Sequence, residues 1–452
     1  MQPCSKLLNV EKYFLILLPQ HLSKNMPNHK YLTAILSVLL LFISITAGHA
    51  QEGKGENVKR GWSIVPLPAL SYDSDMGVQL GVIVVAYYFG NGDTYPEYLH
   101  KFTAEACWFT KGSGIYHFFY DSKHLIKGHR LTASASYIPN TMRPFFGFNG
   151  YLSPYNSGMS SAFYAMKRNL ERIIGDVQGT VAGDLGWSAG ISFYHIATGR
   201  VQADEYSQTT TLYDLYADSG LIKEKEKHGG SHLELRLGAV YDTRDHEPDP
   251  SRGIYSDIIV YGSPDIFNGR EENYLRLAAS FRHFIPVIPK RLTFAYRLSY
   301  QGTLAGNLPF YMQNNFTTLF LRQINSDVLG GAISLRGVQY NRILADGAAW
   351  ANFELRIRLF RFRLLGQDWY TAANPFFDIG QGVQPYRLDA MKNVSQDRDK
   401  IYSGDNEAPH MSAGLGLKLV MNENFVLSAE LGKPFDRRDG KYGIYLNLNY
   451  IF

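Results

Sequence analysis

The segment Asn352-Phe353-Glu354-Leu355-Arg356-Ile357-Arg358-Leu359 alternates without interruption between polar and apolar side chains. A period of two is the repeat of a β-strand, in which successive side chains point to opposite faces of a sheet. The segment therefore predicts a strand with one apolar face and one charged face, on which Glu354, Arg356 and Arg358 lie together.

The same alternation recurs on both sides of this segment. Apolar residues take every second position in residues 233–241, 275–281, 415–419 and 425–431. After residue 50 no amphipathic helix of useful length is predicted, so we expect an all-β chain.

The connections between these strands fall into two classes of length. They are short near residues 286–290 and 421–423, and long at residues 198–230, 304–347 and 381–410. A soluble sandwich would have short turns on both sides. Short turns on one rim and long loops on the other are typical of an outer-membrane β-barrel.

About sixteen candidate strands can be counted between Ser63 and Phe452, and bacterial outer-membrane barrels have an even number of strands. A sheet that spans a bilayer must close, because an open edge would leave backbone groups unpaired in hydrocarbon. The sequence thus predicts a transmembrane antiparallel β-barrel in the bacterial outer membrane.

The composition agrees with a barrel and argues against other classes. The 452 residues include 31 tyrosines and 27 phenylalanines, which suits strands with one apolar face and aromatic girdles at the membrane surfaces. The net charge of +4 is not concentrated in a basic patch, so we expect no nucleic-acid partner. Cys107 would be the single cysteine of the mature chain, and neither a metal site nor another cofactor is predicted.

The N-terminal segment has the features of a secretory signal peptide. Met26 opens a short basic region, residues 32–45 are apolar, and Ala47-Gly48-His49-Ala50 has the small-x-small spacing of a cleavage site. Cleavage is expected after Ala50, and the start at Met1 or at Met26 stays open. The expected division of the chain is residues 1–50 as upstream extension and signal peptide, 51–61 as a short periplasmic tail, and 62–452 as the outer-membrane β-barrel domain.

The C-terminal strand ends in an aromatic residue. Leu446, Leu448, Tyr450 and Phe452 share one parity and are expected to lie on one face, with asparagines on the other. A terminal aromatic on such a strand resembles the sorting signal by which outer-membrane barrels are recognised for assembly. Leu448, Tyr450 and Phe452 are therefore the predicted signal, and the barrel assembly machinery is an expected partner.

The longest connection carries the segment Gly330-Gly331-Ala332-Ile333-Ser334-Leu335-Arg336-Gly337. Gly337 permits a turn at positive φ that would aim the Arg336 side chain in a fixed direction. Glu354 and Asp378 occupy the polar parity of the next two strands, where they would repel each other unless a cation joined them. A guanidinium can fork between two carboxylates. We therefore expect this extracellular loop to fold into the lumen and pair Arg336 with Glu354 and Asp378.

This arrangement resembles the BamA/TamA family, the bacterial surface-antigen barrels that insert or translocate outer-membrane proteins. Arg336-Gly337 and the glycines before it look like the family's loop motif, and Asn352-Phe353-Glu354 and Phe377-Asp378-Ile379-Gly380 look like its two acidic strand motifs. The resemblance implies a barrel whose first and last strands seal weakly. It also implies a lumen lock formed by Arg336, Gly337, Glu354, Asp378 and Gly380.

Two more segments extend the resemblance over nearly the whole mature chain. Residues 241–245, followed by Gly253, look like the family's periplasmic hairpin, and Pro66-Leu67-Pro68 with residues 77–81 resembles the opening hairpin of its compact members. The candidate residues of the periplasmic hairpin are Asp242, Arg244, Asp245 and Gly253.

Two features depart from the family pattern. Val338 stands where the family usually has Phe or Tyr, although Tyr340 follows two residues later. No segment resembles the periplasmic POTRA domains that receive substrates, so we expect a compact form of the family that works with a separate periplasmic partner or does another job.

These features favour a barrel that assists insertion or translocation of proteins, or of lipid, through the seam between its first and last strands. The alternative is a passive, anion-favouring pore or a structural barrel, because inward parity holds more basic than acidic residues. An enzyme is not expected, since no nucleophile elbow, phosphate loop or zinc motif is present. Outer-membrane lipid is an expected partner, and homo-oligomerisation stays open. The inward-parity residues are Arg236, Arg276, Arg282, Arg297, Arg356, Arg358 and Lys418, against Glu234, Glu354, Asp378 and Glu430.

Overall fold

A computed structural model describes most of the chain beyond residue 57. The expected signal peptide at residues 1–50 and the tail at residues 51–57 lie outside the described residues. The described residues are 58–73, 77–95, 97–201, 210–247, 249–269, 271–315, 328–364, 367–386, 388, 398–421, 425–448 and 450–452.

Seventeen strands are present in the described ranges, and β6 is a two-residue strand beside β7, which leaves sixteen strands in the main sheet. The helices are short, and none in the described ranges is long and apolar enough to span a membrane. The strands are β1 (Trp62–Asp73), β2 (Gly77–Tyr88), β3 (His100–Phe109), β4 (Ser113–Ile126), β5 (His129–Ile138), β6 (Arg143–Pro144), β7 (Ala165–Ala182), β8 (Leu185–Gly199), β9 (Gly229–Asp242), β10 (Gly253–Ser263), β11 (Tyr274–Ile288), β12 (Leu292–Gly306), β13 (Gly347–Leu364), β14 (Gln367–Gln384), β15 (His410–Met421), β16 (Phe425–Pro434) and β17 (Gly443–Leu448). The helices are α3 (Leu212–Asp218), α4 (Arg398–Ile401), η3 (Glu224–Glu226), η4 (Phe310–Asn315) and η6 (Arg437–Asp439).

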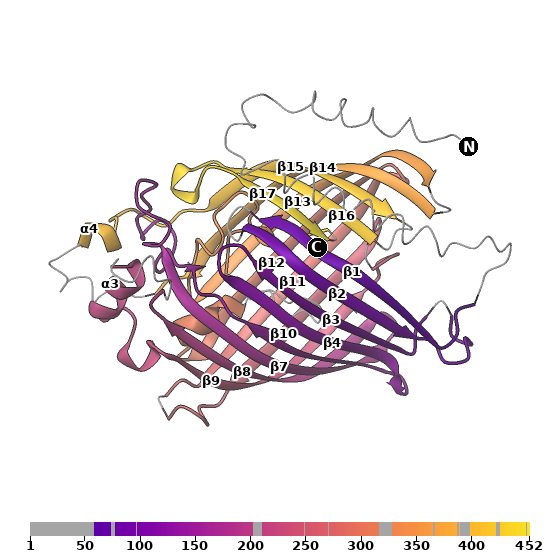
Figure 1. Cartoon of the computed structure of the whole chain (residues 1–452), viewed down its shortest axis with the longest axis horizontal. Coiled ribbons are helices and arrows are strands. Elements are labelled where there is room, and N and C mark those ends of the chain that lie inside the picture. Colours follow the sequence, from indigo (N-terminus) through magenta and orange to yellow (C-terminus); the bar gives the residue numbers. More distant parts are fainter. Residues whose placement is uncertain are drawn as a thin grey trace, which may run out of the picture. The chain divides into compact units, whose positions relative to one another are not determined.

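Each main strand lies beside the next one along the chain, so the sheet is an antiparallel meander (Figure 1). Its last strand returns to the first, because β17 pairs with β1 at Asp73↔Tyr445. The predicted fold class, an all-β antiparallel barrel of about sixteen strands, is confirmed.

Burial is inverted relative to a soluble protein. On β9, Leu235 and Leu237 are 55% and 68% exposed, whereas Glu234 and Arg236 are 2% and 5% exposed. An outer face covered with large apolar side chains suits hydrocarbon and would aggregate in water. The charged face predicted for the strands is therefore the lumen face.

The two ends of the barrel differ in their connections. β1 begins and β17 ends at one end, where two residues join β4 to β5, β7 to β8, and β13 to β14. At the opposite end, long loops at residues 139–164, 200–228, 307–346 and 385–409 join the strands. Short turns belong to the periplasmic side of such barrels, so the long loops are extracellular.

The extracellular loops pack together into one hydrophobic core in the mouth of the barrel. Phe145 and Phe148 of one loop contact Tyr216 of α3, with ring centroids 5.3 and 5.1 Å apart. Phe310 of η4 joins the same cluster, as does Leu335, which precedes Arg336 and is fully buried. The Arg336 loop is thus anchored by apolar packing on its extracellular side.

The end of the chain departs from the prediction. β17 ends at Leu448, whose side chain lies outside the described residues, and Leu446 is 44% exposed on the outer face. Tyr450 and Phe452 are 9% and 8% exposed, and both contact the inward-facing guanidinium of Arg356. The expectation that all four residues share one face is therefore wrong for the last two, because the chain turns into the lumen after the strand. The sorting role of Leu448, Tyr450 and Phe452 stays a prediction.

Candidate functional site

The loop between β12 and β13 enters the barrel through glycines with positive φ. Gly330, Gly331 and Gly337 have φ of +113°, +91° and +94°, which glycine adopts readily. The Gly337 amide donates to the Tyr445 hydroxyl at 3.1 Å. A Cβ added to Gly337 would lie 2.5 Å from the carbonyl carbon of Gly432. The loop backbone therefore lies directly against β16 and β17.

Arg336 is the centre of the site and its side chain is fully buried. Its Nε and Nη2 donate to the two carboxylate oxygens of Asp378, at 2.9 Å each. Its Nη1 donates to Glu354 Oε1 at 2.6 Å, and its backbone amide donates to Asp378 at 3.0 Å. The structure thus brings together the arginine and the two carboxylates singled out in the sequence.

A third carboxylate completes the charge balance. Arg336 Nη1 also donates to Glu430 Oε1 on β16 at 2.9 Å, and Lys418 Nζ on β15 donates to the same oxygen at 2.8 Å. Arg356 Nε on β13 donates to Glu354 Oε2 at 3.0 Å. Three cations therefore balance three carboxylates, which lessens the penalty of burying them. The term Arg336 cluster denotes Arg336, Arg356, Lys418, Glu354, Asp378 and Glu430.

Neutral side chains complete the surroundings of the cluster. Asn352 Nδ2 donates to Asp378 Oδ1 at 2.8 Å and to the backbone oxygen of Ser334 at 2.6 Å. The ring of Phe376 lies 3.6 Å from the guanidinium carbon of Arg336. Asn352 therefore ties the loop backbone to one carboxylate, and Phe376 covers one face of the planar cation.

The electrostatics of the site keep Arg336 charged. Burial by itself would lower the pKa of its guanidinium, but Asp378, Glu430 and Glu354 outweigh burial and raise that pKa well above its usual range. A group held in this way does not exchange protons near neutral pH. The cluster can therefore hold the loop against four consecutive strands, from β13 to β16.

Gly380 serves the site by its lack of a side chain. A Cβ added there would lie 2.9 Å from the Cβ of Trp350 and 3.1 Å from Leu335 Cδ1. Leu335 is fully buried beside Arg336, so the loop packs in the space that Gly380 leaves.

The sequence predicts that Glu430 has inward parity, but it does not connect Glu430 to Arg336. The available signal was the alternation of residues 425–431, which puts Glu430 on the lumen face of the strand before the last one. Gly432 and Tyr445 gave no signal, since their closeness to the loop backbone depends on the tertiary structure.

The predicted periplasmic hairpin lies between β9 and β10, at the end of the barrel where β1 begins and β17 ends. Arg244 Nε and Nη2 donate to the two carboxylate oxygens of Asp242, both at 2.8 Å. Asp245 accepts from the backbone amides of Ser251 and Arg252 at 2.9 and 3.1 Å. Burial tends to raise the pKa of the Asp245 carboxyl, but these hydrogen bonds and that of the Ser251 hydroxyl lower it below its usual value.

Gly253 begins β10 with φ of +106°, and an added Cβ would lie 2.3 Å from the backbone oxygen of Thr243. The same loop reaches across to two distant strands. Asp249 accepts from Arg358 Nη2 of β13 at 3.0 Å and from the Tyr370 hydroxyl of β14. The hairpin therefore crosses the periplasmic mouth, opposite the mouth that the extracellular loops fill.

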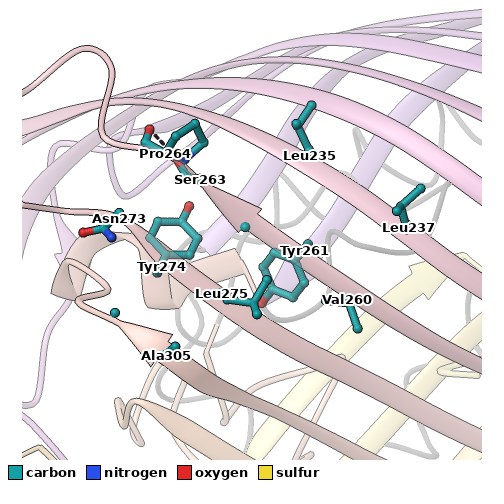
Figure 2. Close-up of a pocket in the computed structure, with 12 residues that line it drawn as sticks. Leu235, Leu237, Val260, Tyr261, Ser263, Pro264, Asn273, Tyr274, Leu275 and Ala305 are labelled. Atoms are coloured by element: carbon teal, nitrogen blue, oxygen red, sulfur yellow. Dashed lines mark hydrogen bonds between the residues drawn. The ribbon is translucent and has the colours of Figure 1, made fainter.

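A hollow of about 440 Å³ lies over β9 to β12 near their extracellular ends (Figure 2). Its lining includes Leu235, Leu237, Val260 and Leu275, all exposed on the outer face. The hollow shares no residue with the Arg336 cluster. No group of three or more His, Cys, Asp or Glu that could hold a metal ion occurs within the described ranges.

Comparison with known proteins gives the family. The profile of the Omp85 superfamily domain matches residues 154–452. No curated protein matches the chain in sequence. The solved structures that are similar in fold include BamA from Haemophilus ducreyi lacking POTRA domains 1–3, and CdiB from Escherichia coli.

The match to the BamA structure has 15% sequence identity and a TM-score of 0.56, and covers 87% of this chain and 71% of that one. The match to CdiB has 11% identity and a TM-score of 0.52, and covers 86% of this chain and 62% of that one. At these identities the likeness concerns the fold. Because the family match spans well over half of the sequence, the chain belongs to the Omp85 superfamily of outer-membrane β-barrels.

Proposed function

We propose that this barrel assists the insertion or translocation of proteins, or of lipid, at the outer membrane through the seam between β1 and β17. The observation that carries the proposal is the weakness of that seam. β1 pairs with β2 at every residue from Trp62↔Tyr88 to Asp73↔Gly77, whereas Asp73↔Tyr445 is the one register pair that joins β1 to β17 within the described ranges.

The two ends of the seam differ in their pairing. Asp73 is the last residue of β1 and lies at its extracellular end, so the periplasmic part of the β1 edge has no partner strand in the described ranges. Unpaired backbone groups are unfavourable in hydrocarbon. An edge of this kind would attract a pairing strand and disturb the lipid around it, and both effects lower the barrier to insertion.

The Arg336 cluster supports this role as a scaffold and takes no part in transport itself. It ties the loop to β13, β14 and β16, and the adjacent Gly337 contacts Tyr445 of β17. A seam can open without unravelling the barrel only if the neighbouring strands are held in place. We therefore assign to the cluster the holding of the wall beside the seam.

A passive anion pore has less support. Inward-facing cations are neutralised within the barrel, as in the pairs Arg236–Asp176 at 2.7 Å and Lys418–Glu430 at 2.8 Å. The extracellular loops also pack into one hydrophobic core at one mouth, and the hairpin that holds Asp249 reaches β13 and β14 at the other. Both segments would narrow a conducting lumen.

The test is an insertion assay in liposomes. The purified protein is reconstituted, an unfolded second barrel is added, and folding is followed by protease protection. We expect faster folding of the added barrel than in empty liposomes, because the unpaired edge of β1 offers a pairing site in the bilayer. Liposomes that hold an unrelated, fully paired barrel at the same protein-to-lipid ratio are the control. A rate equal to that control would contradict the proposed function.

A further inference from the structure

β1 carries two prolines, Pro66 and Pro68, in a strand of twelve residues. Proline has no backbone N–H and cannot donate to a ladder, so within sheets it is confined to edges where the missing donor faces away from the partner strand. Two prolines in one strand of a closed barrel are therefore unexpected unless one edge of that strand has no partner strand.

The hydrogen bonds at the start of β1 show which edge the prolines face. Gly61 donates its amide to Gly90 at 2.8 Å and accepts from the Phe89 amide at 2.9 Å, so residue 61 points toward β2. Backbone groups alternate between the two edges of an antiparallel strand, and the β1–β2 register runs without a bulge. Odd-numbered residues of β1 thus point toward β2, and Pro66 and Pro68 point toward the seam.

The register of the seam sets the prolines against the end of the chain. A regular continuation from Asp73↔Tyr445 would place Pro68 opposite Tyr450 and Pro66 opposite Phe452. β17 does not continue that far, since it ends at Leu448. β17 therefore ends just before the positions at which Pro68 and Pro66 lack a backbone N–H donor.

The residues that would face the prolines turn into the lumen and are held there. Arg356 Nη2 donates to the backbone oxygen of Phe452 at 2.8 Å, and its guanidinium carbon lies 3.9 Å from the centre of the Tyr450 ring. Arg297 Nη1 donates to the backbone oxygen of Ile451 at 3.3 Å. Because Arg356 also binds Glu354, the tail is connected to the Arg336 cluster.

We infer that Pro66 and Pro68 keep the periplasmic half of the seam from pairing and thereby divert residues 450–452 to Arg356 and Arg297 in the lumen. The prolines are positioning residues, because they act through the path of the last strand. The inference deepens the proposed function and its functional part rests on that proposal. Its structural part has a test of its own.

The structural test is a disulfide between β1 and the tail. Leu67→Cys and Ile451→Cys would be opposite one another in a continued ladder, as a non-hydrogen-bonded pair with Cα atoms about 4.5 Å apart, which a disulfide can bridge. With Cys107→Ser as background and the prolines present, we expect almost no disulfide, since Ile451 is held in the lumen. With Pro66→Val and Pro68→Val added, we expect most of the folded protein to form it.

The matched control is the pair Leu67→Cys and Ile83→Cys, which lie opposite each other on β1 and β2 and should cross-link with or without the prolines. Each proline replacement alone should give an intermediate yield, which keeps the test informative should the double replacement not fold. The inference is overturned if the Leu67–Ile451 disulfide forms fully with both prolines present, or stays absent in a folded Pro66→Val, Pro68→Val protein.

The liposome insertion assay distinguishes the role of the prolines from the proposed function of the seam. The Pro66→Val, Pro68→Val protein without added cysteines enters the liposome insertion assay beside the wild-type protein. We expect the acceleration to be lost as the seam pairs. If the disulfide yield rises as expected but insertion is as fast as before, the prolines control the seam while the proposed use of the seam is wrong.

Discussion

Replacing Arg336 by alanine should have the largest destabilising effect on the barrel. The change leaves Glu354, Asp378 and Glu430 buried with two cations, Arg356 and Lys418, so one negative charge is uncompensated. Removing one partner of a buried ion pair costs about 3–5 kcal/mol. We expect the urea midpoint and the temperature of the heat-induced mobility shift of the folded barrel on SDS gels to fall accordingly.

A double-mutant cycle tells charge imbalance from simple loss of packing. Adding Asp378→Asn to Arg336→Ala restores two cations against two carboxylates, so the double variant should be more stable than Arg336→Ala alone. Arg200→Ala, which removes a partly exposed ion pair with Asp214, is the matched control and should change stability by less than about 1 kcal/mol. An Arg336→Ala protein as stable as this control would show that the cluster does not hold the loop.

Gly337→Ala should have the second-largest effect, although it adds a single methyl group. The added Cβ would lie 2.5 Å from the carbonyl carbon of Gly432 and 2.6 Å from the Lys433 amide nitrogen, and both atoms belong to the backbone of β16. The φ of +94° is also unfavourable for alanine. We expect a loss of about 2–5 kcal/mol, from about 1–2 for the left-handed backbone and about 1–3 for overpacking, measured by the same two assays.

Gly183→Ala is the control for the backbone part of this effect. Gly183 lies between β7 and β8 with φ of +54°, and an added Cβ would meet nothing within 4 Å. It should therefore show the loss due to positive φ without the clash. Equal losses for the two variants would mean that close approach of the loop to β16 is not important for the fold.

The fold could be predicted from the sequence because its signal is local and repeated. The alternation in residues 352–359 and in the other strands indicates which side chains face lipid and which face the lumen. The loop lengths distinguish the extracellular end of the barrel from the periplasmic end. Membrane burial imposes this pattern on every strand, so a few misjudged boundaries do not alter the result.

The site was predictable where charge and parity together select a partner. Glu354 and Asp378 stand on inward parity in neighbouring strands, and a buried acid pair requires a cation such as Arg336. The link from Arg336 to Glu430 was not predictable in this way, because it joins the loop between β12 and β13 to β16, and that contact depends on the tertiary structure. The contact of Gly337 with Gly432 likewise depends on how deeply the loop enters.

The inward turn of the chain end shows a different limit. The alternation of residues 445–452 describes a strand, and nothing in that segment says that the strand stops at Leu448. We place the cause almost 400 residues earlier, in Pro66 and Pro68, and it becomes visible only when the register of the seam is known. Edge pairing is a property of two segments, so a pattern in one of them cannot determine it.

The most direct test of the role of the seam is to lock β1 to β17 reversibly. Tyr72→Cys and Leu446→Cys in a Cys107→Ser background would stand opposite each other one residue along from Asp73↔Tyr445. The oxidised protein, with β1 covalently joined to β17, is compared with the same protein after reduction in the liposome insertion assay. We expect oxidation to abolish the acceleration, because β1 can no longer separate from β17, and we expect reduction to restore it. An oxidised protein that inserts the second barrel as fast as the reduced one would show that insertion does not depend on the seam between β1 and β17.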